Sequence, residues 1–159
     1  MLVFGVGMLP AIATMAKHGA SVTDFESAST VAESQAILSE WGGAGERAMW
    51  WQLALDTPFV VCYGLLLAGG CAAVARRAHQ VGKPRAERAA VIFAWLGALA
   101  ALADLAQNIS LAIVLAGSVS QPWPTISSLA VPITLLFGAA AAAFALGGAV
   151  VTRPPARDT

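Results

Sequence analysis

Asp56 and Asp104 are the residues of this sequence best placed for chemistry, because each is the only charged side chain in a long apolar segment. The charges nearest to Asp56 are Arg47 and Arg76, and Asp104 is the only charge between positions 89 and 152. A carboxylate at membrane depth costs ~2.5–3.5 kcal/mol on insertion scales, so an intramembrane Asp indicates a functional site by default. Without Lys or Arg in the same segments, two such carboxylates could share a proton, bind a cation or hold an amine.

Other polar side chains lie on helical faces close to these aspartates. Gln107 and Asn108 follow Asp104 at i+3 and i+4, so the three share one face of a helix. Tyr63 lies on the same helical stripe as Asp56, about two turns deeper. Counted at about 1.5 Å per residue from the basic ends of the apolar segments, Thr134 reaches a similar height. We therefore expect a ligand-binding layer near the outer face, formed by Asp56, Tyr63, Asp104, Gln107, Asn108 and Thr134.

The two carboxylates leave three functions open. The first is binding of a small molecule, lipid or cation, with the aspartates as anionic anchors. The second is a membrane enzyme that acts on a lipid or isoprenoid, with one carboxyl group as the acid and the other as the base. In the third, the chain is an accessory subunit of a larger membrane complex, and the aspartates only tie helices together or pair with Lys17 or His18. No catalytic residue is assigned.

Several other kinds of site are disfavoured. His18 and His79 are predicted on opposite sides of the membrane, which argues against a two-histidine haem site or a histidine-rich zinc site. Cys62 and Cys71 do not form a C-x-x-C pair, and the sequence contains no G-x-S-x-G elbow or P-loop. We therefore predict no metal site, and the cofactor is unknown. A formal net charge of zero argues against a nucleic-acid partner.

The composition is that of a membrane protein. Of the 159 residues, 58 % are hydrophobic and 11 % are charged, against about 25 % charged residues in soluble domains. The mean hydropathy is +0.72. Four apolar segments, at about 1–18, 48–75, 89–117 and 127–151, predict a single integral membrane domain over residues 1–159 with four transmembrane helices. The first segment is marginal in length. A signal peptide over residues 1–16 is the alternative to a retained helix.

Basic residues predict the direction of the four helices. The segment 76–88 holds five Lys or Arg residues and the tail adds Arg153 and Arg157, whereas the loop 17–47 holds two and the loop 118–126 holds none. Basic loops stay in the cytoplasm. The expected fold is therefore an all-α, up-down-up-down bundle with both termini in the cytoplasm.

The acidic outer loop contains a further helix signal. Thr30 and Glu33 have the spacing of a capping box, and the apolar residues that follow are spaced as on a helix. Gly42 then interrupts this pattern. We expect a short amphipathic extracytoplasmic helix at about 30–41, with its Trp41 side at the membrane interface.

Small residues predict close helix contacts. Ala139, Ala143 and Gly147 recur at four-residue spacing in the last segment, a pattern that lets helices approach closely. This packing could serve the bundle itself, a homo-oligomer or a membrane partner subunit, and the sequence does not choose between them.

Short motifs resemble those of a family of small uncharacterised bacterial four-helix membrane proteins. The resemblance rests on Asp24-Phe25-Glu26 through Trp41-Gly42, on Leu55-Asp56 with Phe59 and Tyr63-Gly64, and on Ala103-Asp104 with Asn108, over about residues 20–112. In that family an acidic residue often precedes the asparagine, where this chain has Gln107. The resemblance implies the topology and a bacterial cytoplasmic membrane, and it brings no known activity.

Overall fold

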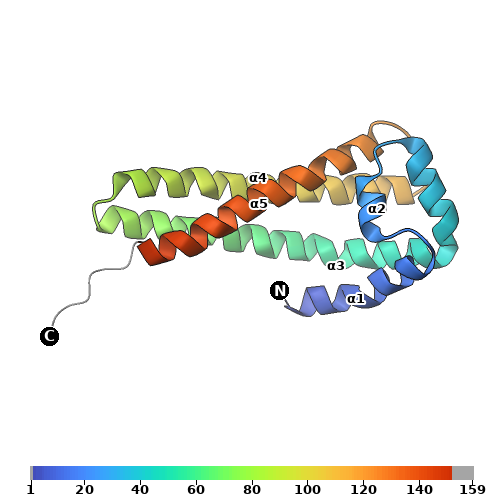
Figure 1. Ribbon diagram of the computed structural model, residues 1–159, viewed down its shortest axis with the longest axis horizontal. Coiled ribbons are helices and arrows are strands. Elements are labelled where there is room, and N and C mark those ends of the chain that lie inside the picture. Colours follow the sequence, from blue (N-terminus) through green and yellow to red (C-terminus); the bar gives the residue numbers. More distant parts are fainter. Residues whose placement is uncertain (1, 152–159) are drawn as a thin grey trace.

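The computed structural model describes residues 2–151, and the side chains of residues 6–148. Its elements are all helices: α1 (Leu2–Lys17), α2 (Val22–Ser27), α3 (Val31–Gln80), α4 (Pro84–Leu115) and α5 (Trp123–Val151) (Figure 1). Within the described residues, three helices are long and apolar enough to cross a membrane: α3, α4 and residues Trp123–Gly148 of α5. The all-α prediction is confirmed, and these three helices indicate a multi-pass membrane protein.

The first apolar segment forms a helix that is shorter than the other three. α1 has 16 residues, below the ~20 that a bilayer core requires, and its apolar part Val6–Lys17 is not among the three candidate spans. A fourth transmembrane helix and the direction of the bundle therefore stay predictions.

The expected amphipathic helix is the first arm of α3. It begins with the capping box that the sequence indicated, because the Glu33 amide donates to the Thr30 hydroxyl and the Thr30 amide donates to the Glu33 carboxylate. Gly42 then has φ 53° and ψ −169°, which is not helical, and the helix resumes at once in a new direction. The positive φ favours glycine at this position. The second arm of α3 thus starts well before the expected boundary at 48.

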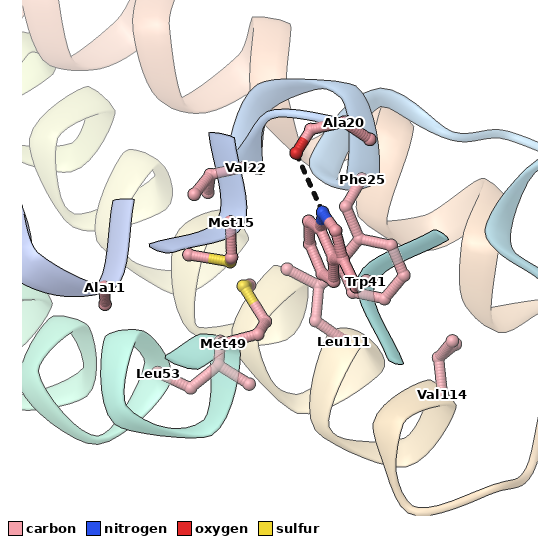
Figure 2. Close-up of a cluster of buried hydrophobic side chains, with 10 residues drawn as sticks. All are labelled: Ala11, Met15, Ala20, Val22, Phe25, Trp41, Met49, Leu53, Leu111 and Val114. Atoms are coloured by element: carbon pink, nitrogen blue, oxygen red, sulfur yellow. Dashed lines mark hydrogen bonds between the residues drawn. The ribbon is translucent and has the colours of Figure 1, made fainter. Parts of the chain in front are cut away.

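The membrane-interface prediction for Trp41 is wrong. The side chain is 1 % exposed, and its indole nitrogen donates to the carbonyl of Ala20 at 2.8 Å. Its ring lies 5.0 Å from that of Phe25, centroid to centroid. Figure 2 shows both rings in a cluster with Met15, Met49 and others from α1, α3 and α4. The sequence pattern assigned Trp41 to the surface because it did not show that the chain from 18 to 27 folds over it.

Helices α3 and α4 run antiparallel and meet at a tight turn, and α5 crosses them obliquely (Figure 1). Small residues set the spacing between these helices. A Cβ atom placed on Gly64 of α3 would lie 2.8 Å from the Cβ of Ala101 on α4, and one on Gly148 of α5 would lie 2.7 Å from Val74. A larger side chain at either glycine would push the helices apart.

Helix α2 packs at the end of the bundle opposite the α3–α4 turn (Figure 1). It has its own capping box, in which the Ser21 hydroxyl accepts from the Asp24 amide and the Asp24 carboxylate accepts from the Ser21 amide. α2 contacts both α3 and α5 (Figure 1). Its buried residues are Val22 and Phe25, so one face of this short helix points into the protein.

Candidate functional site

The two aspartates lie on neighbouring helices, and each accepts a hydrogen bond from the opposite helix. The Asn108 side-chain amide of α4 donates to Asp56 of α3 at 2.7 Å. The Tyr63 hydroxyl of α3 donates to Asp104 of α4 at 2.8 Å. Both aspartates are half-buried. The structure therefore brings together four residues of the expected layer: Asp56, Tyr63, Asp104 and Asn108.

Gln107 and Thr134 are placed differently. Gln107 is buried next to Asn108 in α4, with 5 % of its surface exposed. The Thr134 hydroxyl of α5 donates to the backbone carbonyl of Ala100 in α4 at 3.3 Å. That bond ties α5 to α4 one turn away from Asp104. Thr134 thus has a structural partner, which leaves its hydroxyl oxygen as an acceptor only.

Glu26 of α2 is a third carboxyl group of this site, and the sequence analysis missed it. Burial, and after it the negative charges of Asp56 and Asp104, together raise the pKa of Glu26 to about 7. Burial disfavours the charged form of a carboxyl group, and nearby like charges act in the same direction. The charges of aspartates on α3 and α4 therefore act on a carboxyl group of α2.

A signal for Glu26 was present in the sequence. Ser21 and Asp24 have the spacing of a capping box with Asp in place of the usual Glu, which places a helix start at 22. On that helix Val22, Phe25 and Glu26 fall at i, i+3 and i+4 and share a face. The two apolar residues indicate that this face points into the protein, and Glu26 on the same face is half-buried in the structure.

The main chain at Glu26 is attached to α5. The Ser127 hydroxyl, on a side chain that is 1 % exposed, donates to the Glu26 carbonyl at 3.1 Å. The Thr125 hydroxyl donates to the Ser29 carbonyl at 3.0 Å. Together with the packing of Phe25 on Trp41, these bonds hold α2 over the end of the bundle that contains the aspartates.

In the described part of the chain, no basic side chain forms an ion pair with Glu26, Asp56 or Asp104. The expected alternative partners Lys17 and His18 are exposed at the end of α1. Among the described residues, no group of three or more His, Cys, Asp or Glu side chains has the geometry of a metal site. The charges of Asp56 and Asp104 thus act on Glu26, but the three carboxyl groups are not arranged to bind one metal ion together.

Gln52 adds an unsatisfied acceptor one helical turn from Asp56. Its side-chain nitrogen contacts the sulfur of Met8 at 3.4 Å, and its side-chain oxygen is buried without a hydrogen-bond partner in the described structure. A buried acceptor without a donor costs ~1–3 kcal/mol. Gln52 and Asp56 lie on one face of α3, because they are four residues apart. A water molecule or a ligand with N–H or O–H groups would supply the missing donor.

No protein-family model matches this chain, and the searches of curated proteins and of solved structures also give no match. The resemblance to a bacterial four-helix membrane family therefore stays a prediction.

Proposed function

We propose that this multi-pass membrane protein binds a small organic cation at the carboxyl groups of Glu26, Asp56 and Asp104. The observation that supports the proposal most directly is the electrostatic state of Glu26, which is half-buried, is repelled by both aspartates and has no basic ion-pair partner among the described residues. An uncompensated buried charge is unfavourable, so the site gains free energy either from a bound cation or from protons.

The carboxylates of Asp56 and Asp104 keep free hydrogen-bond acceptor positions for a ligand. Asp56 and Asp104 each accept one side-chain hydrogen bond from the opposite helix. An ionised carboxylate has about four acceptor positions, so most of them are free to face an ammonium group. Because no three carboxyl groups among the described residues converge at metal-ligand distance, an organic ammonium ion, which is larger than a bare metal ion, fits the arrangement better.

We further propose the expected topology for this function. The basic turn between α3 and α4 would face the cytoplasm of a bacterial cell, and α1 would enter the membrane as a fourth, shorter helix. The carboxyl groups would then lie near the outer face under α2. A cation could reach them from the outside without crossing the apolar half of the bundle.

The test is a thermal-stability titration in detergent at pH 8 with tetraethylammonium chloride as the probe and sodium chloride as the ionic-strength control. The expected result is a concentration-dependent rise in melting temperature with tetraethylammonium beyond that with sodium, because a ligand that binds only the folded state stabilises it. The variants Glu26→Gln and Asp104→Asn are expected to lose this rise. Glu33→Gln is the matched control, since Glu33 is exposed and glutamine also completes a capping box.

The same variants separate binding from a purely structural role. Asparagine at position 56 or 104 can still accept the hydrogen bond from Asn108 or Tyr63, because its amide oxygen is an acceptor. If the aspartates only tie helices together, Asp56→Asn and Asp104→Asn will keep the full response to tetraethylammonium. That outcome would contradict the proposed function and favour the accessory-subunit hypothesis.

A second candidate function is supported by the pKa of Glu26 itself. A carboxyl group with a pKa of about 7 is suited to general acid or base catalysis at neutral pH. A membrane enzyme acting on a lipid or isoprenoid would use Glu26 to transfer a proton and the aspartates to stabilise positive charge. Such an enzyme would show turnover that rises or falls around pH 7 in the wild type and is lost in Glu26→Gln.

A further inference from the structure

Three apolar hollows follow the contact between α3 and α4, and no described residue of α5 lines any of them. The hollow nearest the carboxyl groups has a volume of about 300 Å³ and the middle one about 350 Å³. The third, at the end near the α3–α4 turn, is the largest at about 430 Å³. We call this third hollow the seam groove, and it is lined by Ala72, Ala75, Arg76, Ala90, Val91, Ala94 and Trp95.

The seam groove is apolar along its length and has a cation at one end. Four of its lining residues are alanines, which leave space between the two helices. Arg76 is the only charged residue in the lining and lies one turn beyond Ala72 on α3, about 6 Å along the axis. Trp95, with 69 % of its surface exposed, lies further from the turn on α4. This is the shape and polarity of a site for a hydrocarbon chain that carries an anionic group at one end.

The charge around Arg76 supports the same occupant. The segment 76–88 holds five Lys or Arg residues and a single acidic residue, Glu87. The Glu87 carboxylate contacts His79 at 3.2 Å. Clusters of basic residues at the end of a transmembrane helix attract anionic lipid headgroups, by about 1 kcal/mol for each residue near the surface. A phosphate beside Arg76 would therefore meet a strongly positive surface.

We propose that the seam groove is a binding site for an anionic phospholipid, with the phosphate against Arg76 and one acyl chain between α3 and α4. The site is separate from the carboxyl groups at the other end of the bundle and does not depend on the proposed cation binding. A second copy of the chain is a poorer occupant. Copies in one membrane share a direction, so their two basic turns would lie side by side and repel each other.

The experiment is native mass spectrometry of the protein after incubation with equal amounts of phosphatidylglycerol and phosphatidylcholine of identical acyl chains. We expect phosphatidylglycerol to be retained over phosphatidylcholine, and Arg76→Gln to lower its retention about fivefold. Arg85→Gln is the matched control, because it removes the same charge from the same segment at a residue that does not line the groove. Ala72→Trp, which fills the groove, is expected to lower the retention of both lipids. Glycerol 3-phosphate, which has the anionic group without the chains, is expected not to displace the lipid.

Three results would overturn the proposal. Equal retention of the two lipids would show that the anionic headgroup is not recognised. An equal loss in Arg76→Gln and Arg85→Gln would show diffuse attraction to the basic turn without a defined site. A dimer that carries no lipid would show that a second copy occupies the groove. Circular dichroism verifies that each variant retains its helices.

Discussion

The two ends of the bundle are built on different principles. Near the α3–α4 turn the helices approach one another through glycine and alanine, as at Gly148 against Val74 and at Gly97 against Leu67 and Ala141. At the opposite end, α2 and the first arm of α3 pack over α3, α4 and α5, and large side chains such as Trp41, Phe25 and Met49 fill the interior. The first end needs only shape complementarity between straight helices. The second end needs a folded segment, and that segment brings a carboxyl group, Glu26, to the two aspartates.

This difference has a consequence for function. Close helix contacts in a membrane depend on small residues and leave little room for polar groups. We call the end under α2 and the first arm of α3 the covered end. It contains buried polar side chains such as Gln52, Asn108 and Ser127, which make contacts between different helices. A binding site for a charged ligand is therefore expected at the covered end, whereas the tightly packed end offers an apolar groove at its surface.

Truncation of Trp41 should break the covered end and has the largest expected effect. Trp41→Ala removes a buried ring that contacts Phe25, together with the hydrogen bond to the Ala20 carbonyl. Phe or Trp truncation in a core costs ~3–5 kcal/mol. We expect a lower melting temperature in detergent and proteolytic cleavage near residues 18–30.

Trp41→Phe is the control for this change, because it keeps a buried aromatic ring and loses the hydrogen bond, worth ~1 kcal/mol, and only part of the ring volume. A melting temperature for Trp41→Ala equal to that of Trp41→Phe would show that the cluster does not hold α2 in place.

The pH dependence of stability should include a contribution from Glu26 at the covered end. The pKa of Glu26 is about 7 in the folded protein, against 4.5 as its ordinary value. A carboxyl group with a raised pKa binds protons more tightly in the folded state than in the unfolded state. Its contribution to stability is complete below pH 4.5 and is lost as the pH rises to about 7, by about 3 kcal/mol in total. Denaturation in detergent from pH 4.5 to 8 measures this loss.

Glu26→Gln should make the pH profile shallower over the same range, because glutamine does not titrate there. Asp24→Asn is the comparison variant: Asp24 is exposed on the same short helix, and hydrogen bonds from Ser21 lower its pKa. Identical slopes for the wild type and Glu26→Gln would mean that Glu26 is not the titrating group.

A larger side chain at Gly64 should disturb the helix contact beside the hydrogen bond between Tyr63 and Asp104. Gly64→Leu places atoms where only 2.8 Å separates an added Cβ from Ala101. Overpacking of this kind costs ~1–3 kcal/mol, and we expect a lower melting temperature together with a weaker response to tetraethylammonium.

Gly69→Leu tests the same helix at a position where an added Cβ meets nothing within 4 Å. It should leave both measurements close to wild type. A larger loss of stability for Gly69→Leu than for Gly64→Leu would contradict the packing described for α3 and α4.

The expected site was predictable in part because its aspartates lie on long, regular helices. For such helices the spacing of residues fixes both face and height, and this is how Asp104 and Asn108 were placed on one face and Tyr63 on the stripe of Asp56. The partners across the helices could not be predicted. The sequence did not indicate that Asn108 would bind Asp56, or that Thr134 would bind a backbone carbonyl of α4.

The sequence by itself determined the helical class, the three long apolar helices and the capping box that begins α3. These depend on local patterns of hydropathy and on hydrogen bonds between residues three or four positions apart. Only the tertiary structure decided that Trp41 is buried and that Glu26 joins Asp56 and Asp104. Both follow from how the segment between α1 and α3 folds back over the bundle, and contacts between residues so distant in the chain have no signature in local spacing.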